Sequence, residues 1–198
     1  MKFNKSNKLI TAAGLTLIAL TVSGNVLAKG KFRGGIDRID TDGSGTVELQ
    51  EMIDASLAKV AKRFESADTD ADGYISLEEY LAARRDGALD LSLYADEIVA
   101  CMEEAKLEDD TIVVPEASDF LSPEDKLAAK DTDSDGFISL EEAETSATAK
   151  ATEKFTALDA DADGSVTQEE MQAAREEKRP TRKALKACID EVTSDDVL

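Results

Sequence analysis

Residues 131–142 read DTDSDGFISLEE, and the same order of residue types occurs at 40–51, 68–79 and 159–170. Each copy has short oxygen-bearing residues at positions 1, 3 and 5, glycine at position 6, valine or isoleucine at position 8 and glutamate at position 12. One match could arise by chance in so acidic a chain, whereas four complete matches could not plausibly do so. We number these segments loops 1 to 4 in chain order.

The residue types of each loop form a complete set of hard oxygen ligands for one Ca²⁺ ion. Ca²⁺ accepts about six to eight oxygens at about 2.3–2.6 Å, including both oxygens of a long glutamate and a main-chain carbonyl at position 7. Glycine at position 6 permits a sharp backbone turn at little cost. The predicted metal ligands are the residues at positions 1, 3, 5, 7 and 12: Asp40, Asp42, Ser44, Thr46, Glu51, Asp68, Asp70, Asp72, Tyr74, Glu79, Asp131, Asp133, Asp135, Phe137, Glu142, Asp159, Asp161, Asp163, Ser165 and Glu170.

On these four segments the chain resembles the EF-hand family of calcium-binding proteins. The resemblance implies a helix before and after every loop, with Ca²⁺ as the bound ion. It implies an all-α fold of four EF-hand helix-loop-helix units, arranged as two paired lobes with only short two-residue β pairings between loops. Loop 1 departs from the acidic pattern because Ser44 stands at position 5, where Glu48 at position 9 is expected to compensate.

Two ways of pairing the loops are open from the sequence. We favour pairing within each half of the chain, which joins Val47 to Ile75 and Ile138 to Val166. That arrangement requires the chain to reverse within 52–67 and 143–158, although neither stretch contains Gly or Pro. In the alternative, each stretch is one continuous helix, and the loops pair across the two halves.

The loop spacing indicates an internal duplication. Loops begin at residues 40, 68, 131 and 159, so the interval of 28 residues in the first half recurs in the second. We therefore expect a first loop pair with an extra helix at 29–107, a linker at 108–121 and a second loop pair with an extra helix at 122–198.

The first 28 residues are typical of a signal peptide. Lys2, Lys5 and Lys8 precede an apolar run at 9–22, and small residues at Val26 and Ala28 suit a cleavage site. The alternative is a retained anchor helix, although the run is short and mixed for a membrane span. We expect a periplasmic or secreted protein with no membrane attachment after signal cleavage.

Composition excludes several classes of function. The chain has 43 acidic and 23 basic residues, a net charge of −20, so it should repel nucleic acid and attract cations. It has no histidine, which removes histidine zinc ligands and histidine-based acid–base pairs. We find no nucleophile–base pair and no phosphate-binding loop, and we expect that the protein is not an enzyme.

The chain has two cysteines, Cys101 and Cys188, and each belongs to the helix predicted to end one half. In an exported protein two cysteines favour one disulfide. The alternative is a pair of separate buried thiols.

The expected function is that of an exported calcium-binding protein holding up to four Ca²⁺ ions, as a buffer or a Ca²⁺-stabilised module. The alternative is a Ca²⁺ sensor that changes conformation and recruits an unidentified protein partner. Sensors that bind many targets use methionine-rich grooves. After the predicted cleavage only Met52, Met102 and Met171 remain, which argues against such a groove.

Overall fold

The computed structural model describes residues 35–84 and 89–194, so the predicted signal peptide at 1–28 lies outside the described residues. The predicted all-α class is confirmed, with seven α-helices and four two-residue strands in the described part. The helices are α1 (Leu49–Ala67), α2 (Leu77–Ala82), α3 (Ala95–Glu108), α4 (Pro123–Ala128), α5 (Leu140–Leu158), α6 (Gln168–Glu177) and α7 (Arg179–Val192). The strands are β1 (Val47–Glu48), β2 (Tyr74–Ile75), β3 (Ile138–Ser139) and β4 (Ser165–Val166), and three short 3₁₀ helices are η1 (Ile36–Arg38), η2 (Leu91–Tyr94) and η3 (Ala117–Asp119).

The two longest helices, α1 and α5, are each continuous over 19 residues. Each begins at a reciprocal hydrogen-bonded cap, formed by Glu48 with Glu51 in α1 and by Ser139 with Glu142 in α5. With no glycine or proline to interrupt the backbone bonds, each helix continues until the first aspartate of the next loop. At about 1.5 Å per residue, each helix holds its two loops about 28 Å apart.

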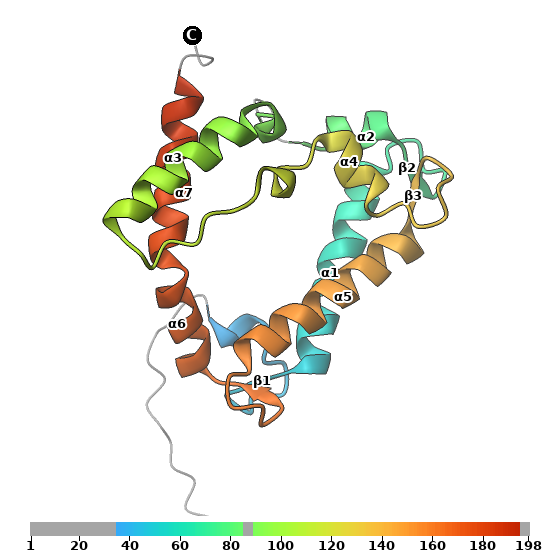
Figure 1. Ribbon diagram of the computed structural model, residues 1–198. Helices are drawn as coiled ribbons and strands as arrows, with labels where there is room; N and C mark the ends of the chain where they lie inside the picture. Colours follow the sequence, from blue (N-terminus) through green and yellow to red (C-terminus); the bar gives the residue numbers. More distant parts are fainter. Residues whose placement is uncertain (1–34, 85–88, 195–198) are drawn as a thin grey trace, which may run out of the picture. The chain divides into compact units, whose positions relative to one another are not determined.

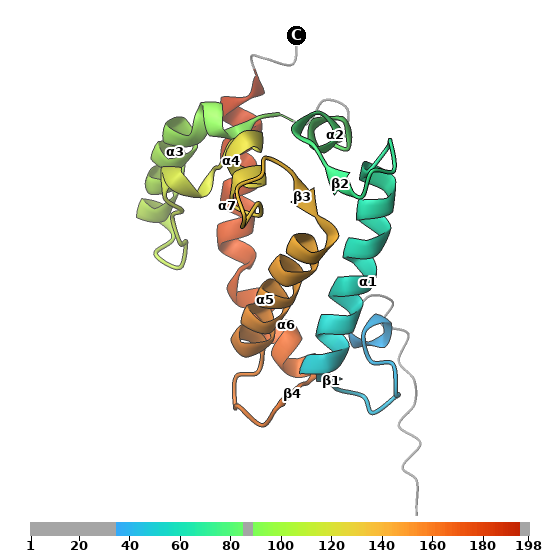
Figure 2. The same cartoon turned by 90° about the vertical axis from the view of Figure 1, so that its right-hand side faces the viewer.

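The loops pair across the two halves of the chain, so our prediction of pairing within each half is wrong. Strand β1 pairs with β4, which places Val47 opposite Val166, and β2 pairs with β3, which places Ile75 opposite Ile138. The physical reason is the straightness of α1 and α5, because a continuous helix keeps consecutive loops at opposite ends. The two helices lie side by side and antiparallel, so loops 1 and 4 meet at one end and loops 2 and 3 at the other (Figures 1 and 2).

Each pair of loops covers its own small hydrophobic core. The core beside loops 1 and 4 contains Val47, Val166, Met52 and Phe155, together with Ile36 of η1. The core beside loops 2 and 3 contains Phe64 and Ala67 of α1, Leu127 of α4, and Ile75 and Ile138 of the sheet. Both cores therefore combine residues from the two halves of the chain.

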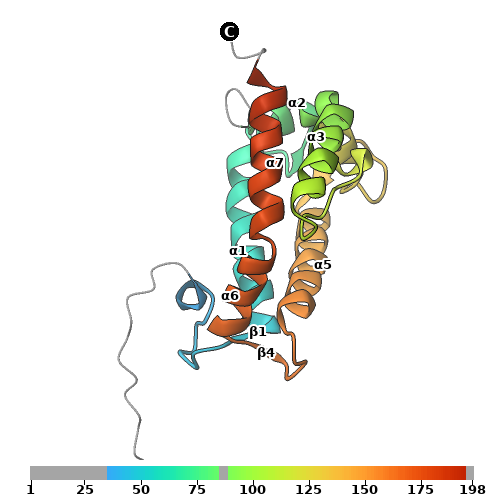
Figure 3. The same ribbon diagram turned by 60° about the vertical axis from the view of Figure 1, so that its left-hand side comes forward.

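A third core lies between α3 and α7, which pack against each other (Figure 3). Ile98 and Met102 of α3 are completely buried there, beside Ile112 and Cys188. Cys101 and Cys188 form a disulfide with a Cα–Cα distance of 5.7 Å, as the sequence favours. The bridge joins two helices that are 87 residues apart in the chain.

The division of the chain into two loop pairs at 29–107 and 122–198 with a linker at 108–121 stays a prediction. Each sheet joins one strand from the first range to one strand from the second.

The start of α4 behaves as its residues require. Ser122 accepts a hydrogen bond from the backbone N–H of Asp125, and Pro123 occupies the first turn. No helix in 35–84 and 89–194 has the length and apolar character needed to cross a bilayer.

Candidate metal centres

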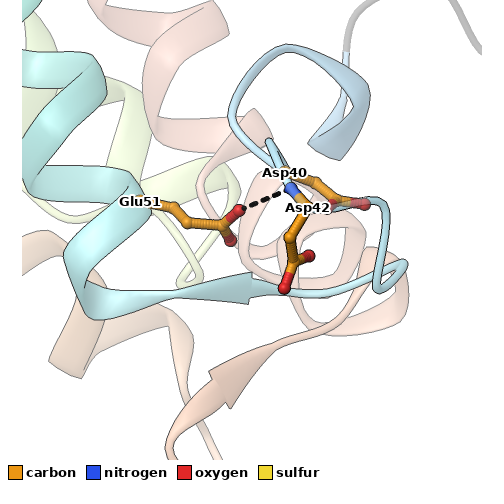
Figure 4. A group of neighbouring side chains, drawn as sticks. All are labelled: Asp40, Asp42 and Glu51. Atoms are coloured by element: carbon orange, nitrogen blue, oxygen red, sulfur yellow. Dashed lines mark hydrogen bonds between the residues drawn. The ribbon is translucent and has the colours of Figure 1, made fainter.

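Acidic side chains converge in every loop, with ligand oxygens within 4.8 Å of one another. In loops 1, 3 and 4 the converging residues stand at positions 1, 3 and 12, whereas in loop 2 they stand at positions 1, 3 and 5. Figure 4 shows the group of loop 1, where Glu51 points from the start of α1 toward the two aspartates of the loop. The four groups are Asp40, Asp42 and Glu51; Asp68, Asp70 and Asp72; Asp131, Asp133 and Glu142; and Asp159, Asp161 and Glu170.

The remaining predicted ligands belong to the same loops but lie outside these close groups. They are the position-5 residues of loops 1, 3 and 4, the position-12 residue of loop 2 and the position-7 residues: Ser44, Asp135, Asp163, Glu79, Thr46, Tyr74, Phe137 and Ser165. Among these, the aspartates at position 5 also shape the loop. The side chain of Asp135 accepts a hydrogen bond of 2.8 Å from the N–H of Phe137, and Asp72 and Asp163 do the same in their loops. The assignment of the position-7 carbonyls as ligands stays a prediction.

Backbone geometry wraps each loop around its first aspartate. The position-6 glycines have φ near +90°, a conformation that strains other residues. From that turn the N–H of Gly136 donates a 2.9 Å hydrogen bond to Asp131 Oδ2, and the equivalent bond is present in the other three loops. One oxygen of the first aspartate is thereby oriented by the backbone.

Position 4 also adopts a left-handed backbone conformation, a feature that our reading of the sequence missed. Gly43 has φ of +76°, whereas Ala71, Ser134 and Ala162 have φ of about +60° despite their side chains. Only the glycine of loop 1 hinted at this requirement, because alanine gives no sequence signal for it. Three of the four loops therefore carry backbone strain at the position before the last short ligand.

The glutamate at position 12 is held from both ends of its loop. In loop 3, Glu142 Oε1 accepts hydrogen bonds from the N–H of Thr132 at 2.6 Å and from its hydroxyl at 2.9 Å. Glu142 Oε2 accepts from both the N–H and the hydroxyl of Ser139, each at 2.9 Å. The residue at position 9 therefore positions the glutamate.

These donors keep the position-12 glutamates ionised. The backbone N–H groups of Ser76 and Thr69 lower the pKa of Glu79 from 4.5 to about 2. Those of Ser139 and Thr132 lower the pKa of Glu142 to the same value, although this side chain is 9% exposed. The pKa values of Glu51 and Glu170 are lowered in the same way, first by the N–H of the position-9 residue.

Repulsion between the acids is visible in loop 3. The N–H of Asp135 lowers the pKa of Asp133, but partial burial and the carboxylates of Asp135, Glu142 and Asp131 outweigh it. The net result is a raised pKa for Asp133. A bound cation would relieve that repulsion.

The donor set fits a hard divalent cation. Every side-chain atom predicted to bind the metal in the four loops is an oxygen, and each loop supplies at least three carboxylates. Such ligands suit Ca²⁺, Mg²⁺ and Mn²⁺ and do not suit metals that prefer sulfur or nitrogen. The residues would hold the ion between positions 1 and 12, and the ion would supply the positive charge that balances them.

Comparison with protein families supports this chemistry. Residues 60–82, 128–142 and 152–173 match the profile of the family described as EF hand. These regions contain loops 2, 3 and 4, while loop 1 lies outside them although its carboxylates converge in the same manner. A comparison with curated proteins found no match.

Proposed function

We propose that this protein, which carries three segments of the EF-hand family, binds up to four Ca²⁺ ions and serves as an exported calcium buffer or calcium-stabilised module. Metal binding of the calcium type follows from the family segments and the convergent acids. The observation that carries the proposal is the convergence of acidic oxygens within 4.8 Å of one another in all four loops. The position-12 glutamate of each loop is also held by hydrogen bonds from positions 2 and 9.

The choice of Ca²⁺ over Mg²⁺ rests on the ligand types. Mg²⁺ requires nearly ideal octahedral geometry at about 2.0–2.1 Å and gives up its water molecules reluctantly. A long glutamate able to bind with both oxygens suits the larger and less regular Ca²⁺ shell. Asp135 and Asp163 supply further oxygens in the same loops.

The arrangement of α1 and α5 supports the buffer or module role. Each of these helices leaves one loop and enters another, so a rotation at one end is transmitted to the opposite sheet. The Cys101–Cys188 disulfide further ties α3 to α7. These connections oppose the independent opening of one loop pair.

A calorimetric titration of the protein with Ca²⁺ and then with Mg²⁺ tests the proposal. We expect about four Ca²⁺ ions per chain, weaker Mg²⁺ binding and a large rise in melting temperature on Ca²⁺ loading, because the ion stabilises only the folded form. Metal-free protein that takes up no Ca²⁺ at millimolar supply would contradict it.

The second candidate is a sensor, and one observation favours it. Leu107 and Val113 are 88% and 68% exposed, and Leu93 is 73% exposed, all near α3. A sensor would enlarge its apolar surface on Ca²⁺ binding. A Ca²⁺-induced rise in the fluorescence of the dye ANS would support the sensor, and an unchanged or lower signal would support the module.

The export part of the proposal rests on different grounds. The disulfide supports it, since disulfides persist mainly in oxidising compartments. The sequence of residues 1–28 supports it as well. We expect protein recovered outside the cytoplasm to begin at Lys29, as measured by intact mass, and a chain that retains residues 1–28 would contradict the cleavage.

A further inference from the structure

A groove of about 1000 Å³ lies between α1 and α5, next to the sheet of loops 2 and 3. Its walls are formed within residues 56–67 of α1 and 143–154 of α5, and Ile75 and Ile138 of the sheet contribute to its lining. The two helices that form the walls can be followed side by side in Figures 1 and 2. We refer to it as the basic groove because of the side chains described next.

Every charged side chain that lines the basic groove is positive. None of the lining residues is Asp or Glu, although the chain has 43 acidic and 23 basic residues. A groove of one sign would not be expected from a composition in which acids outnumber bases nearly two to one. The lining cations are Lys59, Lys62, Arg63, Arg84, Lys130, Lys150 and Lys154.

The fold itself makes little use of these charges. Within residues 35–84 and 89–194, neither Arg63 nor any of the five groove lysines forms an ion pair with a carboxylate. Lys59 and Arg63 stand four residues apart on α1, and Lys150 and Lys154 do so on α5. Like charges at that spacing destabilise a helix, and no ion pair with a carboxylate offsets this for Lys59, Arg63, Lys150 or Lys154 in the described residues.

Three of the cations come to the groove from separate elements. Lys130 precedes loop 3 and is half-buried, with its Nζ 5.1 Å from the centre of the Tyr80 ring. Lys150 of α5 and Arg63 of α1 line the same groove. The aromatic ring stabilises one of these cations, but it does not neutralise the group.

We propose that the basic groove binds a small molecule carrying several tetrahedral oxyanion groups, as phosphates or sulfate esters. Lys130, Lys150 and Arg63 hold one of these groups. Lys59, Lys62 and Lys154 contact the others along the helices.

The types of cation suit this ligand. Five of the seven are lysines, which bind phosphate as compact point charges. The volume lies at the upper end of the range of about 300–1,000 Å³ for small-molecule pockets. A long nucleic acid would extend beyond the groove onto an acidic surface.

The test uses the Ca²⁺-loaded full chain at a fixed free Ca²⁺ concentration, titrated in a calorimeter with two probes. Sucrose octasulfate represents the sulfate source, and inorganic tripolyphosphate represents the phosphate source. We expect at least one probe to bind with one molecule per chain, and the tighter probe identifies the source. Because tripolyphosphate also chelates Ca²⁺, each of its titrations is compared with the variants below under the same conditions.

Two triple variants with the same change of net charge separate the groove from the overall charge. Lys59→Gln, Lys150→Gln and Lys154→Gln alter the groove, whereas Lys106→Gln, Lys178→Gln and Lys183→Gln alter exposed lysines that do not line it. At about three-fold per exposed lysine, the groove triple should bind the probe roughly thirty-fold more weakly, and the control within about two-fold of the parent. Circular dichroism and the Ca²⁺ titration should be unchanged in both.

Two results would overturn the proposal. The first is that neither probe binds to the parent protein; poly-glutamate binding that is lost only in the groove triple would then assign the groove to an acidic protein segment. The second is that the two triple variants lose equal affinity, which would indicate attraction by net charge alone.

Discussion

At the scale of the residue, the proposed function depends most on the position-12 glutamates. Their oxygens accept hydrogen bonds from positions 2 and 9, so the carboxylate is oriented before an ion binds. The energetic consequence is a site in which little side-chain freedom remains to be lost on binding. The same arrangement recurs in loops 1, 2 and 4.

We predict that Glu142→Gln reduces Ca²⁺ affinity at loop 3 by roughly a hundred-fold, about 3 kcal/mol, because the amide loses charge and cannot accept from all of its donors. Calorimetric titration should show one weakened site. The exposed neighbour Glu141 makes the matched control, since Glu141→Gln removes the same charge from the same helix turn. Equal losses in the two variants would mean that net charge, and not ligation, is responsible.

The lowered pKa values predict the acid sensitivity of the metal-free protein. Glu79 and Glu142 titrate at about 2 when folded and near 4.5 when unfolded, so the unfolded state binds protons first as the pH falls. Their stabilising contribution is complete above about pH 4.5 and is lost as the pH approaches 2. Urea unfolding with chelator present, measured at several pH values, should show this decline, and a smaller decline in Glu142→Gln.

Position 4 of the loops offers a test of backbone strain. Ala162 has φ of +58°, so Ala162→Gly should stabilise the folded protein by about 0.5–1 kcal/mol. Gly43 has φ of +76° and no atom within 4 Å of an added Cβ, so Gly43→Ala should cost about 1 kcal/mol through conformation alone. Opposite signs in chemical denaturation are expected, and two destabilised variants would exclude strain at Ala162.

At the scale of the element, α1 and α5 decide which loops act together. Each sheet contains one strand from each half, so loop 2 contacts loop 3 and not loop 1. The exposed rings of Tyr74 and Phe137 also meet across loops 2 and 3, with centroids 6.2 Å apart. Coupling between sites should therefore be stronger across a sheet than along the chain.

Tb³⁺ luminescence excited through Tyr74 can test this coupling, because Tyr74 stands in loop 2. Ile138→Ala removes the strand partner of Ile75 and should weaken Tb³⁺ binding at loop 2. Val47→Ala, in loop 1 at the other end of α1, should weaken that binding less than Ile138→Ala does. Tyr74→Phe confirms that the signal comes from loop 2, and a larger effect of Val47→Ala than of Ile138→Ala would contradict the observed pairing.

At the scale of the whole molecule, small cores are supplemented by one covalent link. The disulfide joins α3 to α7 across 87 residues and limits the freedom of the unfolded chain. We predict that Cys101→Ala with Cys188→Ala lowers the unfolding free energy of the Ca²⁺-loaded protein by about 4–5 kcal/mol on the chain-entropy account. Urea titration measures the difference, and added reductant should destabilise the parent but not the double variant.

The basic groove is also a property of the whole molecule. Its cations come from α1, α5, Arg84 and the residue before loop 3, and no stretch of the sequence contains them together. Lys130 is the residue before Asp131, the first predicted metal ligand of loop 3. Coupling between the two sites would have to be equal in both directions.

Local order was sufficient to predict where acidic side chains converge in the four loops, because the ligand positions of each loop lie within twelve residues. The all-α class followed from the resemblance to the EF-hand family. Tertiary structure alone decided which loops pair, since the sequence of 52–67 is compatible with either a break or one helix. In the structure this stretch is part of the continuous helix α1, and α1 packs on α5, which joins the two halves of the chain. The basic groove likewise depends on residues too distant in sequence for a local pattern to reveal.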